Sequence, residues 1–196
     1  MSGRKIDIKY QNPIDNVLID IAESLNPIFK DIGFNANGIT MISILFKILF
    51  LYCLHKKLYM YSIIYYIIQY FFDTMDGNFA RKYNQTSDFG DKLDHISDSL
   101  TIIFAVIIII KNKNIIFKNK IIIFIINIIF LIIMNIQLGC QEKIYNSNSN
   151  KESMLTPLEF LCKDKNKLMP ITKYFGSGTY TMIICLSILY IKTIDK

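Results

Sequence analysis

The sequence predicts an all-α polytopic membrane protein, and three observations support that prediction. More than half of the 196 residues (52%) are hydrophobic, and the mean hydropathy is positive, at +0.33. The apolar residues are gathered into runs that short polar segments separate. Four aspartates at helical spacings, Asp73, Asp76, Asp94 and Asp98, lie where one apolar run ends and the next begins. This pattern is too apolar for an ordinary soluble domain and is typical of a chain that crosses a bilayer several times.

Residues 1–34 are predicted to lie outside the bilayer core. Residues 1–12 are polar and lack the apolar core and cleavage site of a signal peptide, so we expect a flexible tail. From Pro13 to Ile32 the apolar residues recur at the spacing of an amphipathic helix, which Pro27 is expected to break or kink. Because a membrane helix follows, we expect this segment to lie flat on the membrane surface. A helix packed on the loops of the soluble side also fits the pattern.

Residues 35–196 are predicted to form one transmembrane domain with five clear membrane helices. A sixth is weak or absent, because residues 139–176 contain no run of the ~17–25 apolar residues that a span needs. Lys47 lies inside the first apolar segment, where its side chain either faces the bundle interior or snorkels to the surface. The five segments are residues 39–54, 58–80, 91–110, 121–138 and 180–191.

Basic residues give the expected orientation. If the N-terminus is inside, the inner segments hold 13 of the 22 Lys and Arg and the outer segments hold 8, with Lys47 as the remaining one. The excess is modest, since four lysines between residues 111 and 120 fall outside, but it places the aspartates on the cytosolic side. The membrane would be that of an endoplasmic-reticulum-like compartment or the cytoplasmic membrane. No basic face carries the groove-reading or aromatic side chains of a nucleic-acid site, so no nucleic-acid partner is expected.

The four cysteines predict no metal site. Cys53 and Cys185 fall inside apolar runs, and Cys140 and Cys162 lie in the polar region between the last two spans. No pair has the spacing of metal ligands, so we expect reduced, structural thiols.

Four aspartates form the candidate site. Asp73 and Asp76 are three residues apart, and Asp94 and Asp98 are four apart. On helices, each pair would therefore share one face. Four acids that face each other at the edge of a membrane stay ionised only if cations neutralise them, and oxygen-rich sites of this kind suit Mg²⁺ or Mn²⁺. The sequence thus predicts a metal site at the ends of two membrane helices. His95, between the acids, is interpreted as a helix-start polar residue rather than a ligand.

The stretch from residue 73 to residue 98 fits the pattern D-x-x-D-G-x-x-A-R-x8-G-x3-D-x3-D at every fixed position. It resembles the signature of the class-I CDP-alcohol phosphotransferases, and the resemblance extends over roughly residues 37–110. The fixed positions are Asp73, Asp76, Gly77, Ala80, Arg81, Gly90, Asp94 and Asp98. Asn37 and Thr40 also resemble the Asn-x-x-Thr that opens the first helix in this family.

The resemblance implies a reaction in which an alcohol hydroxyl attacks the β-phosphorus of a CDP-linked lipid or alcohol and CMP leaves. It implies two metal ions held by Asp73, Asp76, Asp94 and Asp98, with Asp98 also acting as general base on the acceptor hydroxyl. Two such ions can bind the diphosphate, and phosphoryl transfer needs little beyond this positioning and charge neutralisation. The residues implied to contact the CDP moiety are Asp73, Gly77, Ala80, Arg81 and Gly90, with Asn37 and Thr40 bordering the nucleotide.

The acceptor stays open at this point. NQTSDFG, residues 84–90, resembles the NQ-x-S-x-FG of eukaryotic-type phosphatidylinositol synthases. LDHISDSL, residues 93–100, resembles the DH-x-x-DSL of choline/ethanolamine phosphotransferases, which use diacylglycerol. The short chain favours the size class of phosphatidylinositol or phosphatidylglycerophosphate synthases. We therefore expect inositol or another polyol, with the diacylglycerol-using type as the alternative.

Two further expectations concern partners and activity. Family members usually have six membrane helices, of which the later ones shape the lipid cavity and a dimer contact, so the resemblance allows a homodimer. A catalytically inactive relative that serves as a membrane scaffold is the main non-enzyme alternative. The four carboxylates and Arg81 are intact, which favours an active enzyme.

Overall fold

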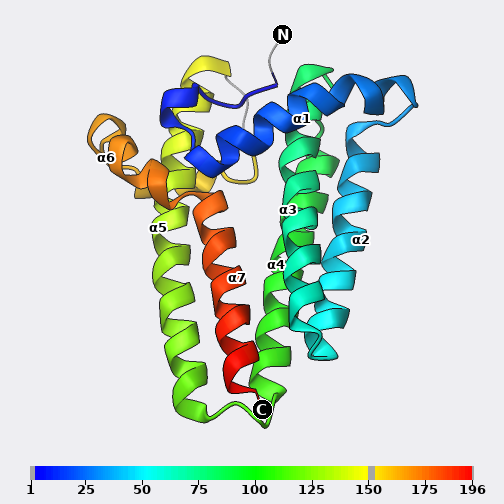
Figure 1. Ribbon diagram of the computed structural model, residues 1–196. Coiled ribbons are helices and arrows are strands. Elements are labelled where there is room, and N and C mark those ends of the chain that lie inside the picture. Colours follow the sequence, from blue (N-terminus) through cyan, green and yellow to red (C-terminus); the bar gives the residue numbers. More distant parts are fainter. Residues whose placement is uncertain (1–2, 150–152, 196) are drawn as a thin grey trace.

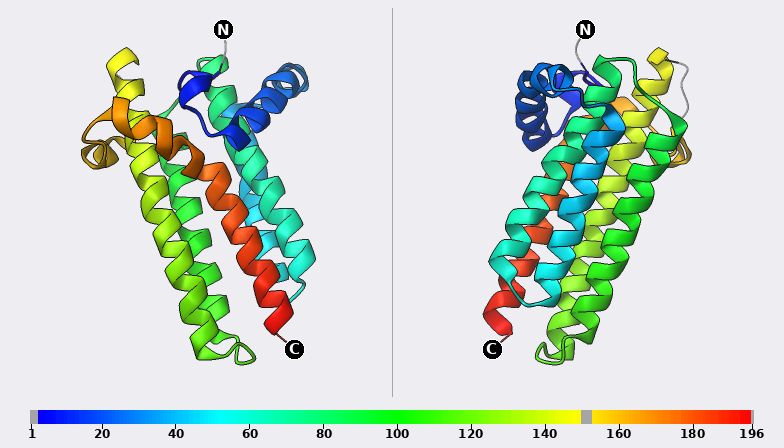
Figure 2. Two further views of the ribbon diagram at one scale, coloured as in Figure 1. Left: turned by 60° about the vertical axis from the view of Figure 1, so that its left-hand side comes forward. Right: turned by 90° about the vertical axis from the view of Figure 1, so that its right-hand side faces the viewer.

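The computed structural model describes residues 3–149 and 153–195, and these residues form helices and no strands. Five long helices, α2 (Ala36–His55), α3 (Tyr59–Lys82), α4 (Asp88–Lys111), α5 (Phe117–Ser149) and α7 (Ser177–Ile194), run along a common direction as a bundle (Figures 1 and 2). Helix α1 (Pro13–Asp31) lies across one end of this bundle, near the N-terminus, and the C-terminus lies at the other end (Figure 1). The all-α prediction is confirmed.

Short helices connect α5 to α7 at the same end as α1. They are η2 (Thr156–Leu161), α6 (Lys165–Thr172) and η3 (Lys173–Phe175), while η1 (Ile8–Tyr10) precedes α1. Four helical segments are long and apolar enough to cross a membrane, namely α2, α4, Phe117–Ser147 of α5, and Lys165–Ile194, which contains α7. Helix α3 is long enough with 24 residues but is not among them, because tyrosines and aspartates interrupt its apolar run. The count of five spans therefore stays a prediction.

Helix α1 is continuous. Of the two outcomes expected at Pro27, a break into two helices is wrong. The helix continues through Pro27 to Asp31. Its buried residues follow a helical spacing and face α3, where Asn26 Nδ2 donates to Asn78 Oδ1 at 2.7 Å. This packing stabilises the helix beyond the proline, at which only one backbone donor is lost. The predicted place of α1 on the membrane surface stays a prediction.

Residues 3–12 do not form the flexible tail that their polarity predicted. Ile6 is 5% exposed and Asn12 is fully buried. Gly3 lies so close to α3 that an added Cβ would come within 2.2 Å of the Asn78 carbonyl oxygen. Arg81 Nε also donates to the Gly3 carbonyl at 2.8 Å. Polar contacts with backbone hold this segment in place, and a hydropathy pattern does not reveal them.

Helix α5 extends eleven residues beyond the predicted end at residue 138. Its polar continuation is helical because its side chains are buried against other segments: Gln137 accepts from Thr172 Oγ1 at 2.6 Å, and Glu142 is 1% exposed and pairs with Lys5. Residues 146–153 (NSNSNKES) have the composition of a loop tip, yet residues 146–149 continue α5, and residues 150–152 lie outside the described residues.

Two of the four cysteines are paired, so the prediction of reduced thiols is wrong for them. Cys140 in α5 and Cys162, which follows η2, form a disulfide, while Cys53 and Cys185 are free and buried. Their 22-residue separation matches no motif, and they meet because η2 packs along α5.

The apolar cluster with the most buried members lies at the end of the bundle away from α1, and a smaller one around Ile39, Met75 and Phe79 lies against α1. The larger cluster joins the second half of α2, the first half of α3 and the second half of α7, with Phe50, Leu54, Ile63, Cys185, Ile188 and Ile191 among its buried members. The α1 end is instead rich in buried polar side chains, which include Asp15, Thr40, Ser43, Lys47, Gln69 and Asp76. The polar end holds the candidate site.

Candidate functional site

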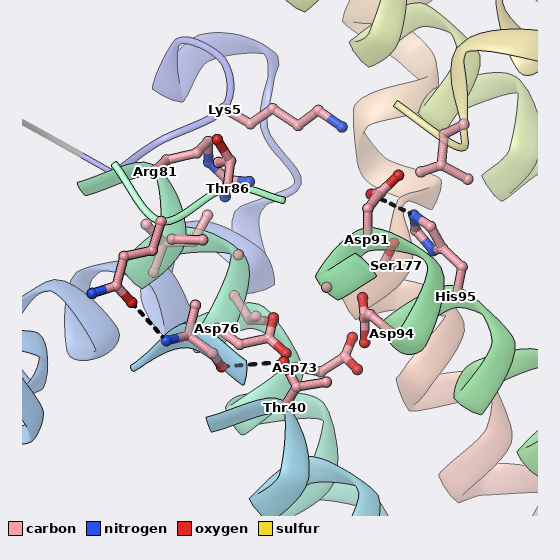
Figure 3. Close-up of a pocket in the computed structure, with 18 of the residues that line it drawn as sticks. Lys5, Thr40, Asp73, Asp76, Arg81, Thr86, Asp91, Asp94, His95 and Ser177 are labelled. Atoms are coloured by element: carbon pink, nitrogen blue, oxygen red, sulfur yellow. Dashed lines mark hydrogen bonds and ion pairs between the residues drawn. The ribbon is translucent and has the colours of Figure 1, made fainter. Parts of the chain in front are cut away.

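A cavity of about 290 Å³ opens at the α1 end of the bundle (Figure 3). The start of α2, the end of α3, the start of α4, and parts of the N-terminal segment, α1, α5 and α7 line it. Nine of the ten residues that the sequence assigned to the site lie along its wall, and Asp98 is the exception. The nine are Asn37, Thr40, Asp73, Asp76, Gly77, Ala80, Arg81, Gly90 and Asp94.

The connection between α3 and α4 brings the aspartates together. Asn84, just after α3, has a left-handed φ of 56°, which is typical of the residue that ends a helix. Ser87 then caps α4 by accepting a hydrogen bond from the Gly90 N–H at 3.1 Å. The chain therefore reverses within a few residues, and the last turns of α3 face the first turns of α4.

Lys47 of α2 links three of the four aspartates. It is 2% exposed, and its Nζ lies 2.8 Å from Asp73 Oδ1, 2.6 Å from Asp98 Oδ1 and 3.6 Å from Asp94 Oδ1. The same Nζ donates to Ser97 Oγ at 2.9 Å. Of the two positions left open for Lys47, the structure selects the bundle interior.

The donor set fits a divalent cation. Asp76 Oδ2 and Asp94 Oδ1 are buried oxygens without a hydrogen-bond partner among the described residues. Burying such acceptors without a partner is costly, and hard cations such as Mg²⁺ and Mn²⁺ bind carboxylate oxygens well. Ligand atoms of Asp94, His95 and Asp98 also lie within 4.8 Å of one another.

His95, which the sequence analysis did not count as a ligand, lies close enough to Asp94 and Asp98 to be one. Its Nε2 lies 3.3 Å from Asp91 Oδ1, and both residues line the cavity (Figure 3). Sequence reasoning set His95 aside and left Asp91 out. Position 95 lies between the two α4 ligand positions, and this adjacency is the signal that could have marked it.

The predicted nucleotide contacts gather where α2, α3 and α4 meet. A Cβ at Gly90 would lie 2.9 Å from Asn37 Oδ1, so glycine allows α4 to approach α2 closely. Gln85, in the connection, accepts from the Ala36 N–H at 2.9 Å and fixes the start of α2. Arg81 is held by the Gly3 carbonyl and borders the cavity (Figure 3).

Residues that sequence reasoning missed line the cavity where α1 meets α3 and α7. Tyr70 Oη donates to Asp15 Oδ1 at 2.6 Å, and Gln11 Nε2 donates to Asp15 Oδ2 at 3.2 Å. Burial raises the pKa of Asp15, and these hydrogen bonds offset part of that rise. Asp15 shares the buried face of α1 with Ile19 and Ala22, at helical spacing. This spacing is the feature of the sequence that could have marked Asp15 as buried. Lys5, Gln141 and Ser177 also line the cavity and were not predicted.

Comparison with protein families gives a match over most of the chain. The family model described as CDP-alcohol phosphatidyltransferase matches residues 34–193. This range contains Lys47 and all four aspartates, whereas the N-terminal segment and α1 precede it. Comparison with curated proteins gives no match, and comparison with solved structures gives none either.

Proposed function

Since the chain belongs to the CDP-alcohol phosphatidyltransferase family, whose members transfer phosphatidyl groups from a CDP-alcohol, we propose that it makes a phospholipid from CDP-diacylglycerol and a polyol such as inositol. CMP is the second product. The observation that supports this most is the gathering of Asp73, Asp76 and Asp94 around one cavity, where buried oxygens of Asp76 and Asp94 accept no hydrogen bond.

In the proposed site, Asp73, Asp76, Asp94 and Asp98 would hold two Mg²⁺ or Mn²⁺ ions. When bound, such ions neutralise the diphosphate and stabilise the entering and leaving oxygens. The acceptor oxygen forms a bond to the β-phosphorus, and the bond from that phosphorus to the bridging oxygen breaks. CMP leaves with the electron pair, and the hydroxyl proton passes to Asp98, the proposed general base.

The proposed CDP contacts lie on the wall formed by α2, α3 and α4. Gly90 leaves room for close backbone approach, and Arg81 offers a planar donor fork to a phosphate. The remaining proposed contacts are Asn37, Thr40, Asp73, Gly77 and Ala80.

Polar side chains where α1 meets α3 and α7 support a hydroxyl-rich acceptor. Gln11, Asp15, Tyr70 and Ser177 offer hydrogen-bonding groups there, and a polyol can use several of them at once. Diacylglycerol has one free hydroxyl and two acyl chains, which such a wall suits poorly. The LDHISDSL stretch keeps the diacylglycerol-using reaction as the alternative.

We further propose that the site faces the cytosol and that the protein works as a homodimer in its membrane. The end of α3 and the start of α4, which contain the four aspartates, lie at the same end as the N-terminus (Figure 1). The modest excess of basic residues favours this end as the inner one. The Cys140–Cys162 disulfide joins α5 to the segment after η2, towards the same end. It favours the opposite orientation, because disulfides persist mainly in oxidising compartments. Labelling of a cysteine introduced at Asn84 by a membrane-impermeant reagent, in intact and in opened vesicles, tests the orientation.

The function is tested by CMP release from the purified protein with Mg²⁺ or Mn²⁺. CDP-diacylglycerol is offered with inositol, inositol phosphate, glycerol 3-phosphate or serine, and CDP-choline or CDP-ethanolamine is offered with diacylglycerol. We expect release with CDP-diacylglycerol and a polyol, and none from an Asp76→Asn control. Release only with diacylglycerol would establish the alternative reaction, and no release with any pair would favour the scaffold.

A further inference from the structure

We propose that Lys47 is a resident cation of the aspartate cluster, and that divalent ions load the site by exchange with its ammonium group. This inference rests on the metal site of the proposed function, and it concerns a residue outside the matched signature. Lys47 would keep the cluster neutralised at low divalent-ion concentration and would set the concentration at which the enzyme becomes loaded.

The ammonium group of Lys47 and a metal ion would need the same carboxylate oxygens of Asp73 and Asp98. Lys47 Nζ lies 2.8 Å from Asp73 Oδ1 and 2.6 Å from Asp98 Oδ1. A Mg²⁺ ion would lie about 2.0–2.1 Å from each ligand oxygen. A metal ion on these two atoms would therefore lie within about 5 Å of the ammonium nitrogen, and like charges at such a separation repel each other strongly in a poorly solvated site.

The four aspartates differ in their hydrogen-bond and ion-pair partners. Asp76 Oδ2 accepts no hydrogen bond, and Asp94 Oδ1 accepts none and makes the longest of the three contacts with Lys47, at 3.6 Å. Asp73 and Asp98 are instead held by Lys47, and Asp98 does not line the cavity. Completing a four-aspartate site at these oxygens thus requires Lys47 to release Asp73 and Asp98.

Lys47 is buried, and its charge depends on the carboxylates around it. A lysine that is 2% exposed needs partners, and Lys47 has the three carboxylates and Ser97 Oγ. Removing the ammonium leaves Asp73, Asp94 and Asp98 close together without a cation. A neutral side chain at position 47 should therefore weaken the metal-free protein and strengthen its affinity for divalent ions.

The test combines Mn²⁺ binding with thermal unfolding, neither of which depends on catalysis. Free Mn²⁺ is measured by electron paramagnetic resonance in detergent, and unfolding is followed in EDTA and across a Mn²⁺ series. We expect Lys47→Met to bind Mn²⁺ at least about tenfold more tightly than the wild type and to unfold at a lower temperature in EDTA. Lys47→Arg keeps the charge and should keep the weak affinity. Lys57→Met, which removes a lysine at the other end of the bundle, is the matched control and should leave Mn²⁺ affinity unchanged.

The result that overturns the proposal is equal or weaker Mn²⁺ binding by Lys47→Met, because a residue that only positions the carboxylates would weaken binding when removed. If Lys47→Met does not fold in EDTA, it is purified with Mn²⁺, and its unfolding temperature must then rise more steeply with Mn²⁺ than that of the wild type. Asp76→Asn tests the metal site separately from the role of Lys47. If the wild type and Asp76→Asn do not differ in Mn²⁺ binding, the metal site itself fails, and the Lys47 proposal fails with it.

Discussion

Each end of the bundle contains a lysine paired with aspartate, and the two clusters differ in their balance of donors and acceptors. At the C-terminal end, Asp195 accepts from Lys57 Nζ at 2.9 Å, from Asn112 Nδ2 at 2.9 Å and from the Tyr59 hydroxyl. Three donors there serve one acid.

At the α1 end, one ammonium serves three acids. Lys47 contacts Asp73, Asp94 and Asp98, and Asp76 beside them keeps a carboxylate oxygen without a donor. A cluster with enough donors is complete and needs no ligand, whereas an excess of buried acceptors calls for cations. The comparison teaches that donor balance, rather than the presence of buried charge, separates a structural cluster from a functional one.

The largest expected effect comes from removing the proposed base at the α1 end. Asp98→Asn should lower CMP release by at least about a thousandfold, within the range that general bases contribute, while CDP-diacylglycerol binding stays largely in place. Initial rates and lipid binding measured on the same preparation check both parts. Asp88→Asn, at the exposed start of α4, is the control and should keep its rate. An unchanged rate for Asp98→Asn would remove Asp98 from the base role.

A smaller effect is expected where α4 approaches α2. Gly90→Ala puts a Cβ at 2.9 Å from Asn37 Oδ1, so the nucleotide wall must shift by a few tenths of an ångström. We expect KM for the CDP-lipid to rise roughly tenfold, which corresponds to about 1.4 kcal/mol, with unchanged thermal unfolding. Steady-state kinetics over a range of CDP-lipid concentrations measure this. If KM stays constant, the nucleotide does not contact this wall.

The disulfide should affect stability at the α1 end. Replacing Cys140 and Cys162 together by serine removes a cross-link with a sequence separation of 22 residues, for which a loss of about 2–4 kcal/mol is typical. The free energy of unfolding, compared under reducing and non-reducing conditions, measures the loss. The double variant should be insensitive to reductant. If the wild type is also insensitive, the two thiols are not paired in the isolated protein.

The smallest effect is expected at the complete cluster. Lys57→Met removes one of three donors, and Lys57 is 44% exposed, so we expect a loss of at most about 1 kcal/mol in stability and no change in CMP release. A drop in activity as large as that of a site variant would show that the two ends are coupled.

The complete cluster also predicts a response to acid. Burial raises the pKa of Asp195, but hydrogen bonds from Tyr59, Asn112 and Lys57 outweigh it and lower the pKa to about 2. The unfolded carboxyl has a pKa of about 3.9, so the cluster contributes its full stability above that value and loses it as the pH falls towards 2. Acid unfolding of Asp195→Asn against the wild type measures this contribution, and the two curves should converge at the acid end.

The sequence predicted the parts of the site that depend on one helix or on one turn. Asp73 and Asp76, and likewise Asp94 and Asp98, share a helix face because of their spacing, and Gly90 and Arg81 follow at fixed distances. The all-α class followed from the apolar runs. The hydropathy of α3 is nevertheless lowered by its tyrosines and by the site aspartates Asp73 and Asp76.

Contacts between distant segments could not be predicted in this way. Lys47 stood out as a charge in an apolar run, but its partners come from α3 and α4, and the packing of the helices decides them. The polar residues after position 138 were expected to end α5, yet Glu142 meets Lys5, 137 residues earlier in the chain. Cys140 and Cys162 meet for the same reason.

The N-terminal segment has a consequence for how the catalytic unit is delimited. Residues 34–193 match the family, and a chain trimmed to them would retain every aspartate and Lys47. It would lose Lys5, Gln11 and Asp15, which line the cavity, and also the backbone carbonyl that orients Arg81. Boundaries drawn from family similarity alone would thus leave the cavity open on one side, and residues 3–31 belong to its wall as much as the membrane helices do.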